Sequence, residues 1–156
     1  MNSNDIRRAM RRQGKADALD LASRAPQMTG TAIIAEEDKI PAWSESAVYT
    51  AAQVGYPVQD DGQVYQLLMA HTPAHNPGSR PADLRAIYSL LHTTDPAKAK
   101  PWMPSYGTSG LYKLGEVCTY PAADGVTHIW RNLWDNNEFP PLTLNVEGRW
   151  EDLGVA

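Results

Sequence analysis

The chain has 156 residues, 42% of them hydrophobic and 21% charged, which fits a folded protein and excludes a disordered one. A formal net charge of −4 argues against a general nucleic-acid binder, and the single cysteine, Cys118, excludes an intramolecular disulfide. No apolar run approaches the roughly 20 residues that span a bilayer, and no apolar segment follows the basic start as in a signal peptide. We therefore expect synthesis in a cytoplasm and no membrane span.

A helix is predicted over residues 1–24, with Ser3 or Asn4 as its cap. Gly14 weakens this helix by roughly 1 kcal/mol relative to alanine. The apolar stripe along it is thin, and a lone helix of this kind is marginal in water. We therefore expect it to depend on something else to stay ordered.

The first half of this helix has a basic side, made of Arg7, Arg8, Arg11, Arg12 and Lys15. Two interpretations remain open. A run of charge is most often a solvated face. Alternatively, the helix is an arm that docks on an acidic partner, with contacts from Ile6, Arg7, Met10 and Arg11.

Residues 25–42 are predicted to be a linker that contains a short strand at 31–35 and an acidic run at 36–38. We expect residues 1–39, the helix and most of this linker, to form an anchoring arm. The linker ends at Pro41, next to Trp43.

A first small β module is predicted for residues 40–95. Asp60-Asp61-Gly62 is a hairpin turn, because Asp-Gly supplies the positive φ that tight hairpins need. The predicted strands are 48–49, 54–58, 64–69 and a closing strand at 88–91.

A second module, residues 96–156, repeats the first at fixed offsets, the mark of internal duplication. Tyr49 and Tyr112 each follow an aromatic residue by six positions, and an Asp-Gly glycine lies thirteen positions after each. The offsets pair Trp43 with Tyr106 and Tyr65 with His128. An aromatic residue closes each copy, Tyr88 in the first and Trp150 in the second.

The predicted fold is mainly β: two small tandem antiparallel β modules, β-sandwich-like, preceded by an N-terminal α-helical arm. A module of about 45 residues usually needs extra support. Because no disulfide can supply that support, we expect packing between the modules or against partner chains.

The order of residues in each module resembles carbohydrate-binding module families 5 and 12, the chitin-binding units of chitinases. In that family Ala-Trp is followed by Tyr and then by Gly-Asp-x-Val. The first copy has Ala42-Trp43, Tyr49 and Ala52-Gln53-Val54, and the second has Tyr112 and Gly115-Glu116-Val117. The resemblance covers residues 40–154 and implies a domain pair, 40–95 and 96–156, of this type.

One departure narrows the resemblance. Secreted chitin binders follow the middle Tyr with a Trp pair, whereas Tyr65 is followed here by Ala70-His71-Thr72 and no Trp pair. This version is similar to modules in tail proteins of tailed bacteriophages, where a helical arm and an acidic linker lead into Pro-x-Trp. Pro41-Ala42-Trp43 has that form.

The resemblance implies a structural protein of the virion, in the tail or the host-adsorption apparatus, that attaches to other tail subunits. It also implies oligomerisation within the assembly and makes a host-surface glycan a candidate partner. The alternative is a carbohydrate-binding module that recognises a chitin-like glycan without catalysis.

Aromatic rings bind sugars by covering the apolar face of the sugar ring, and they serve protein interfaces equally well. Trp130 and Trp134 would share a face on a continuous strand. The bulkiest aromatic residues of a small core, Trp43, Tyr49, Tyr112 and Trp150, are expected inside. The candidate contact residues are Trp102, Trp130, Asn132, Trp134 and Asp135.

Residues for catalysis or metal binding are not expected. His71 and His75 have the spacing of a helical metal pair, but Pro73 lies between them and a third ligand is missing. Cys118 lies in a predicted strand as a buried structural thiol. The sequence has no Gly-rich phosphate loop and no convincing acid–base pair, so we expect no enzyme, no cofactor and no metal.

Overall fold

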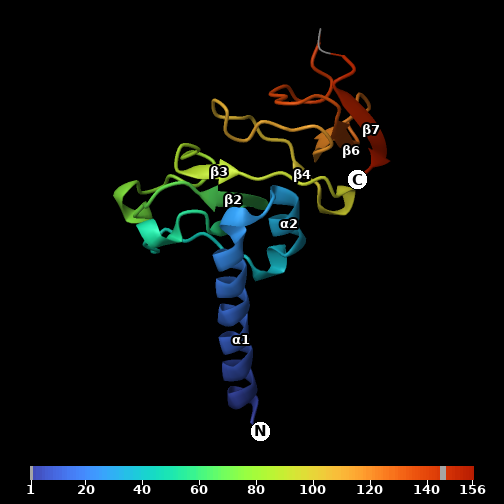
Figure 1. Cartoon of the computed structure of the whole chain (residues 1–156). Helices are drawn as coiled ribbons and strands as arrows, with labels where there is room; N and C mark the ends of the chain where they lie inside the picture. The colour runs from blue at the N-terminus through green and yellow to red at the C-terminus, as the bar shows by residue number, and fades with distance from the viewer. Residues whose placement is uncertain (1, 145–146) are drawn as a thin grey trace.

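The protein was analysed as a computed structural model that describes residues 2–144 and 147–156. An N-terminal helix is followed by two small β-sheets of three and four strands (Figure 1). The first sheet is β1 (Pro57–Asp60), β2 (Gln63–Leu67) and β3 (Tyr88–Leu90); the second is β4 (Lys100–Pro101), β5 (Val117–Pro121), β6 (Thr127–Asn132) and β7 (Trp150–Val155). Because the helix holds 22 residues and β4 pairs with β5 in parallel, the fold is mixed rather than mainly β and antiparallel.

Helix α1 (Ser3–Arg24) projects away from both sheets, with the N-terminus at its far end (Figure 1). The side-chain oxygen of Asn2 accepts a hydrogen bond from Asp5 N at 2.9 Å. The cap is therefore Asn2 and not Ser3 or Asn4 as predicted. Helix α1 continues through Gly14, and its described buried residues, Leu21 and Ala22, lie at its C-terminal end.

The segment predicted to hold a short strand forms a helix instead, α2 (Gly30–Ala35). The Thr29 hydroxyl accepts from Ala32 N at 3.2 Å and caps it. The β-branched pair Ile33-Ile34 favoured a strand, but propensity is weak against burial. Both isoleucines are fully buried in a cluster with Leu21, Ala25, Ile40 and Val64.

Short 3-10 turns join these elements: η1 (Ala25–Gln27), η2 (Glu37–Lys39), η3 (Ala51–Gln53), η4 (Pro73–His75) and η5 (Pro96–Lys98). The cluster around α2 contains the end of α1, the segment up to Ile40 and one residue of β2. The predicted linker therefore packs on the first sheet.

The first sheet confirms the predicted hairpin and closing strand. β1 pairs antiparallel with β2, and β2 with β3. Asp61 and Gly62 have φ of 48° and 73° at the turn between β1 and β2, the positive values that a two-residue hairpin needs. Val58, Tyr65 and Tyr88 belong to the core of this sheet. The strand predicted at 48–49 is reduced to a single bridge between Tyr49 and His71.

The second sheet has the same plan as the first. β5 pairs antiparallel with β6, and β6 with β7. In each sheet a short leading segment runs parallel to the first hairpin strand, Ala42 beside Gln59 and Pro101 beside Thr119. The next residue then donates its backbone N–H to the same strand, Trp43 to Gln59 O at 2.8 Å and Trp102 to Thr119 O at 3.0 Å.

This pairing corrects the register of the duplication. The structural counterpart of Trp43 is Trp102, not Tyr106, because a turn closed by hydrogen bonds between Tyr106 and Ser109 lengthens the second copy. Gly55 N bonds to Leu67 O and Gly115 N to Asn132 O, at 2.7 and 2.8 Å, which aligns the ends of β2 and β6. Tyr65 therefore matches Trp130 rather than His128.

The two tyrosines that define the duplication occupy corresponding environments. Tyr49 meets the closing residue Tyr88 edge-on, with ring centroids 6.1 Å apart, and Tyr112 meets Trp150 edge-on at 5.1 Å. The turn after each tyrosine is closed in the same way. Gln53 accepts from Thr50 N and Glu116 accepts from Lys113 N, each at 2.8 Å.

The two sheets are packed together through a polar and aromatic seam, as the small size of each module led us to expect. The His92 ring stacks on Tyr112 with centroids 3.6 Å apart, and its Nε2 donates to Gly110 O at 2.8 Å. From the other side, Met103 packs against the core of the first sheet. Arg85 crosses the seam and donates to Pro104 O at 2.9 Å. Each sheet therefore completes the core of the other.

Candidate partner-binding surfaces

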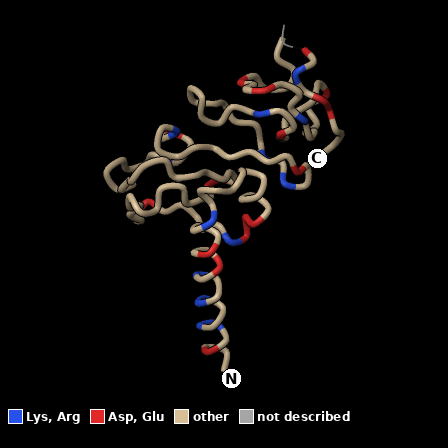
Figure 2. The backbone as a smooth tube through the Cα atoms, in the orientation of Figure 1, with Lys and Arg blue, Asp and Glu red and all other residues tan. Residues whose placement is uncertain are grey.

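The distal part of α1 is the most exposed regular element of the described chain. Ile6 is 42% exposed and Met10 is 68% exposed, and Arg7 and Arg11 are also exposed. At 100° per residue, Ile6 and Met10 lie on one side together with Ala9, Gln13 and Ala16, whereas the basic side lies opposite. Figure 2 shows these basic positions along the projecting helix.

The two borders of the apolar stripe are also basic. Arg7 lies beside Met10 at one edge of the stripe, and Arg12 lies beside Ala9 and Ala16 at the other. A surface that accepted Ile6 and Met10 would therefore meet a guanidinium on each flank. The four residues predicted to dock a partner lie on this free part of the arm.

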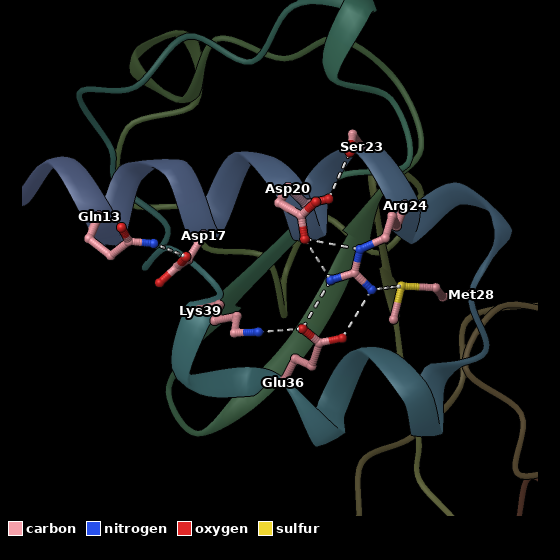
Figure 3. Close-up of polar contacts among 8 residues, drawn as sticks. All are labelled: Gln13, Asp17, Asp20, Ser23, Arg24, Met28, Glu36 and Lys39. Carbon is pink, nitrogen blue, oxygen red and sulfur yellow. Dashed lines mark hydrogen bonds and ion pairs between the residues drawn. The ribbon is translucent and has the colours of Figure 1, made fainter.

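The root of α1 is fixed by an ion-pair network (Figure 3). Arg24 pairs with Asp20 at 2.9 Å and with Glu36 at 3.0 Å, and Glu36 also pairs with Lys39 at 2.7 Å. The hydrogen bond from Arg24 lowers the pKa of Glu36 to about 2. These contacts tie the end of α1 to the turn after α2, so the arm leaves the body in a defined direction.

Trp134 is the exposed tryptophan among the predicted contact residues. Half of its surface, 51%, is exposed, and the Arg149 guanidinium lies 4.3 Å from its ring centroid. The same guanidinium lies 4.9 Å from the Phe139 ring. Asp135 follows in the exposed turn. The stacking holds the Trp134 ring in place on the surface.

Trp130 and Asn132 have internal partners instead. Trp130 is 7% exposed and donates from Nε1 to Tyr120 O at 3.0 Å. Asn132 is fully buried, and its amide donates to Tyr112 O and Lys113 O at 3.0 and 2.9 Å. Strand β6 ends at Asn132, so Trp130 and Trp134 do not lie on one continuous strand.

Trp102 is less exposed than Trp134 and less buried than Trp130. It is half-buried and packs against the core cluster that contains Trp130, and its ring meets Tyr120 edge-on at 6.2 Å. The structure therefore places Trp102 and Trp130 in one cluster and leaves Trp134 outside it. A flat platform of all three rings is not formed.

A cavity of about 310 Å³ opens beside Trp130 on the second sheet. Its lining includes Trp150 and the loop residues Leu142 and Leu144, which are 54% and 81% exposed. Leucines alternate in this loop after Pro140-Pro141, a pattern that the sequence reasoning passed over. The second module thus combines an aromatic-lined hollow with exposed apolar side chains at its rim.

His71 and Cys118 have structural roles, whereas His75 is exposed. His71 Nδ1 lies 2.7 Å from Tyr88 Oη, and its Nε2 lies 3.0 Å from Asn76 Oδ1. Cys118 is fully buried, and burial raises the pKa of its thiol. Within residues 2–144 and 147–156, no group of three or more His, Cys, Asp or Glu is arranged to hold a metal ion.

Helix α1, although 22 residues long, is too polar to cross a membrane, and no other described helix qualifies. Comparison with known proteins finds no matching protein-family model and no significantly similar curated protein. A functional proposal therefore depends on the structure of the chain, above all on the exposed helix α1.

Proposed function

We propose that this chain is a structural subunit of a virion, in the tail or host-adsorption apparatus of a bacteriophage, where it mediates attachment between proteins. The observation that carries the proposal is the exposure of α1. A helix this exposed is marginal alone. Burial against another subunit would stabilise α1 and would cover Ile6 and Met10, which are 42% and 68% exposed.

The body of the chain supports the same proposal. Its two sheets repeat one plan, and the Pro41-Ala42-Trp43 segment that precedes the first sheet has the form found in phage tail proteins with modules similar to carbohydrate-binding families 5 and 12. Residues 1–39 are the anchoring arm in this proposal, and residues 40–95 and 96–156 are the tandem modules. No catalytic activity, cofactor or nucleic-acid partner is part of it.

The test is made on particles. Virions purified from the source of this gene are digested and searched for peptides of the chain, which we expect at structural abundance. A variant that lacks residues 2–17 should keep the folded body, because the described buried residues of α1 are Leu21 and Ala22, but should be lost from the particles. Absence of the intact chain from purified virions would overturn the proposal.

A second candidate function, glycan binding, is favoured by the exposed ring of Trp134. Its flank carries Asp135, and the cation–π contact with Arg149 holds the ring ready for a sugar face. The full chain is titrated with chito-oligosaccharides while tryptophan fluorescence is followed. A saturable quench that Trp134→Ala abolishes supports this function, with Tyr106→Ala as the matched control because Tyr106 is 60% exposed. An unchanged signal rejects it.

A further inference from the structure

A cavity of about 320 Å³ opens between the β1–β2 turn of the first sheet and the segment that begins at β4. Its lining combines apolar side chains with one carboxylate and one amide: Ala82, Pro101, Met103, Tyr65, Asp61 and Gln63. Pockets for small ligands begin at roughly 300 Å³. The cavity therefore has room for one side chain of a partner.

The amide in this lining holds an acceptor that no donor satisfies. Gln63 is 4% exposed, and its Nε2 donates to the backbone oxygen of Pro101 at 2.8 Å. Its Oε1 is buried and has no hydrogen-bond partner within the described residues. A buried carbonyl oxygen without a donor destabilises the fold. A ligand that brought an N–H group to Oε1 would therefore be bound favourably.

The carboxylate of Asp61 is a second open acceptor. Asp61 is exposed, and its side chain makes no ion pair or hydrogen bond with any residue that the structure describes. The nearby Arg80 is paired with Asp60 instead, to which its Nε donates at 2.9 Å. Residues 40–95 hold five acidic and two basic side chains, and the second basic one, Arg85, is buried. The cavity thus has a free carboxylate beside an unsatisfied amide oxygen.

This pair of acceptors beside an apolar wall fits a guanidinium on its hydrocarbon stem. A guanidinium carries five N–H donors in a planar fork and no acceptor, so it can donate to a carboxylate and to an amide oxygen at once. The stem of an arginine packs on apolar surface while its head stays polar. Ala82, Pro101 and Met103 supply that surface.

Free arginines are found on the projecting helix. Four exposed arginines lie in the distal part of α1 and have no ion pair in residues 2–144 and 147–156: Arg7, Arg8, Arg11 and Arg12. Helix α1 projects away from both sheets and its root is tied to Glu36, so these side chains are held away from their own body (Figure 1). Opposite charge steers association between surfaces. A second copy can bring such an arginine to the cavity.

We propose that the cavity lined by Asp61 and Gln63 is a socket for an arginine of α1 from a second copy of this chain. The guanidinium donates to the Asp61 carboxylate and to Gln63 Oε1, and the stem packs on Met103. The inference rests on the proposed function, because it names the partner of the anchoring arm. Arm and socket are different surfaces, so the contact is heterologous.

Two variants of the full chain test the contact from its two sides. The arm variant combines Arg7→Gln, Arg8→Gln, Arg11→Gln and Arg12→Gln. The socket variant is Asp61→Asn, which keeps the turn because asparagine tolerates the φ of 48° at this position. Sedimentation velocity should show concentration-dependent association of the unmodified chain, and each variant should weaken it by at least about tenfold. An equimolar mixture should form a species with one chain of each, because one supplies the arm and the other the socket.

A change of shape without a change of charge separates the socket from general electrostatic attraction. Ala82 is exposed and lines the cavity, so Ala82→Phe should obstruct the cavity and weaken association as Asp61→Asn does. Ala86→Phe, at an exposed alanine outside the lining, is the matched control and should leave association unchanged. Asp135→Asn removes an exposed carboxylate of the second module and should leave association unchanged as well.

The inference is overturned if the unmodified chain stays monomeric at every concentration reached, or if the arm and socket variants fail to pair when mixed. Equal weakening by Asp61→Asn and Asp135→Asn also overturns it, because the attraction would then be a general effect of charge. A chain that needs residues 2–17 for incorporation into particles yet never associates with itself leaves the proposed function standing and removes only this inference.

Discussion

The two modules share one plan but close their cores to different degrees. In the first, Tyr88 is fully buried, and its hydroxyl lies 2.7 Å from His71 Nδ1 and accepts from Trp43 Nε1 at 3.1 Å. In the second, the corresponding Trp150 is half-buried and lines an open hollow. The first copy supports the root of the arm through Val64, and the second carries the hollow lined by Trp130 and Trp150.

The closing aromatics should differ most in their contribution to stability. Tyr88→Ala should lower the free energy of unfolding by about 4 kcal/mol, because it leaves a cavity in a closed core. Trp150→Ala should lower the free energy of unfolding by only about 2 kcal/mol, because part of the Trp150 ring already faces the hollow. Urea denaturation of both variants measures the difference, and equal losses would show that the second core is as closed as the first.

The seam between the modules should make the protein sensitive to acid. Burial is the main cause that lowers the pKa of His92 from 6.5 to about 4. Between these values the unfolded chain binds a proton that folded His92 does not. The free energy of unfolding should therefore fall by about 3 kcal/mol as the pH drops from 6.5 to 4.

Replacement of this imidazole isolates its contribution. His92→Gln keeps a donor for Gly110 O and should flatten this part of the stability profile, measured by urea denaturation across the pH range. His75→Gln, at an exposed histidine, is the matched control. A profile that falls equally in His92→Gln would assign the acid sensitivity to other groups.

Replacement by alanine should have opposite effects on stability at two glycines outside the sheets. A Cβ at Gly30 would lie 2.5 Å from the backbone oxygen of His92, so Gly30→Ala should destabilise the protein by about 2 kcal/mol. A Cβ at Gly14 would meet nothing within 4 Å, so Gly14→Ala should stabilise α1 by about 1 kcal/mol. Thermal unfolding followed by helix circular dichroism at 222 nm measures both, and a destabilising Gly14→Ala would contradict a free arm.

The turns that follow Tyr49 and Tyr112 should contribute equally to stability in the two modules. Gln53→Ala and Glu116→Ala each remove an acceptor of one backbone N–H, a loss of about 1 kcal/mol. Equal changes in the urea midpoint would support the structural equivalence of the two turns. A Glu116→Ala effect more than twice as large would show that the second turn is under a different constraint.

Local chemistry made much of the fold predictable. The Asp-Gly turns and the aromatic residues at Tyr88 and Trp150 indicated the hairpins and the closing strands, because those positions have few alternatives. Helix α2 was not predicted because the β-branched pair Ile33-Ile34 favours a strand. The Thr29 cap and the burial of both isoleucines, which favour the helix, are seen only in the structure. The register between the copies was also wrong, since a longer turn in the second copy offset the sequence spacing.

The candidate site was less predictable than the fold. Sequence spacing marked Trp130 and Trp134 alike, yet one is 7% exposed and the other 51%, because strand β6 ends between them. The exposed arm residues were foreseen from the thin apolar stripe beside a basic run. The hollow by Leu142 and Leu144 depends on how a Pro-rich loop folds over a sheet, which no local pattern specifies.

The exchange of side chains across the seam links the folding of the two halves. His92 packs on the second core, and Met103 packs on the first, so each half contributes to the core of the other. A gene fragment that encoded only one copy would yield a chain with an unfilled core. The two halves are therefore expected to unfold together rather than one after the other.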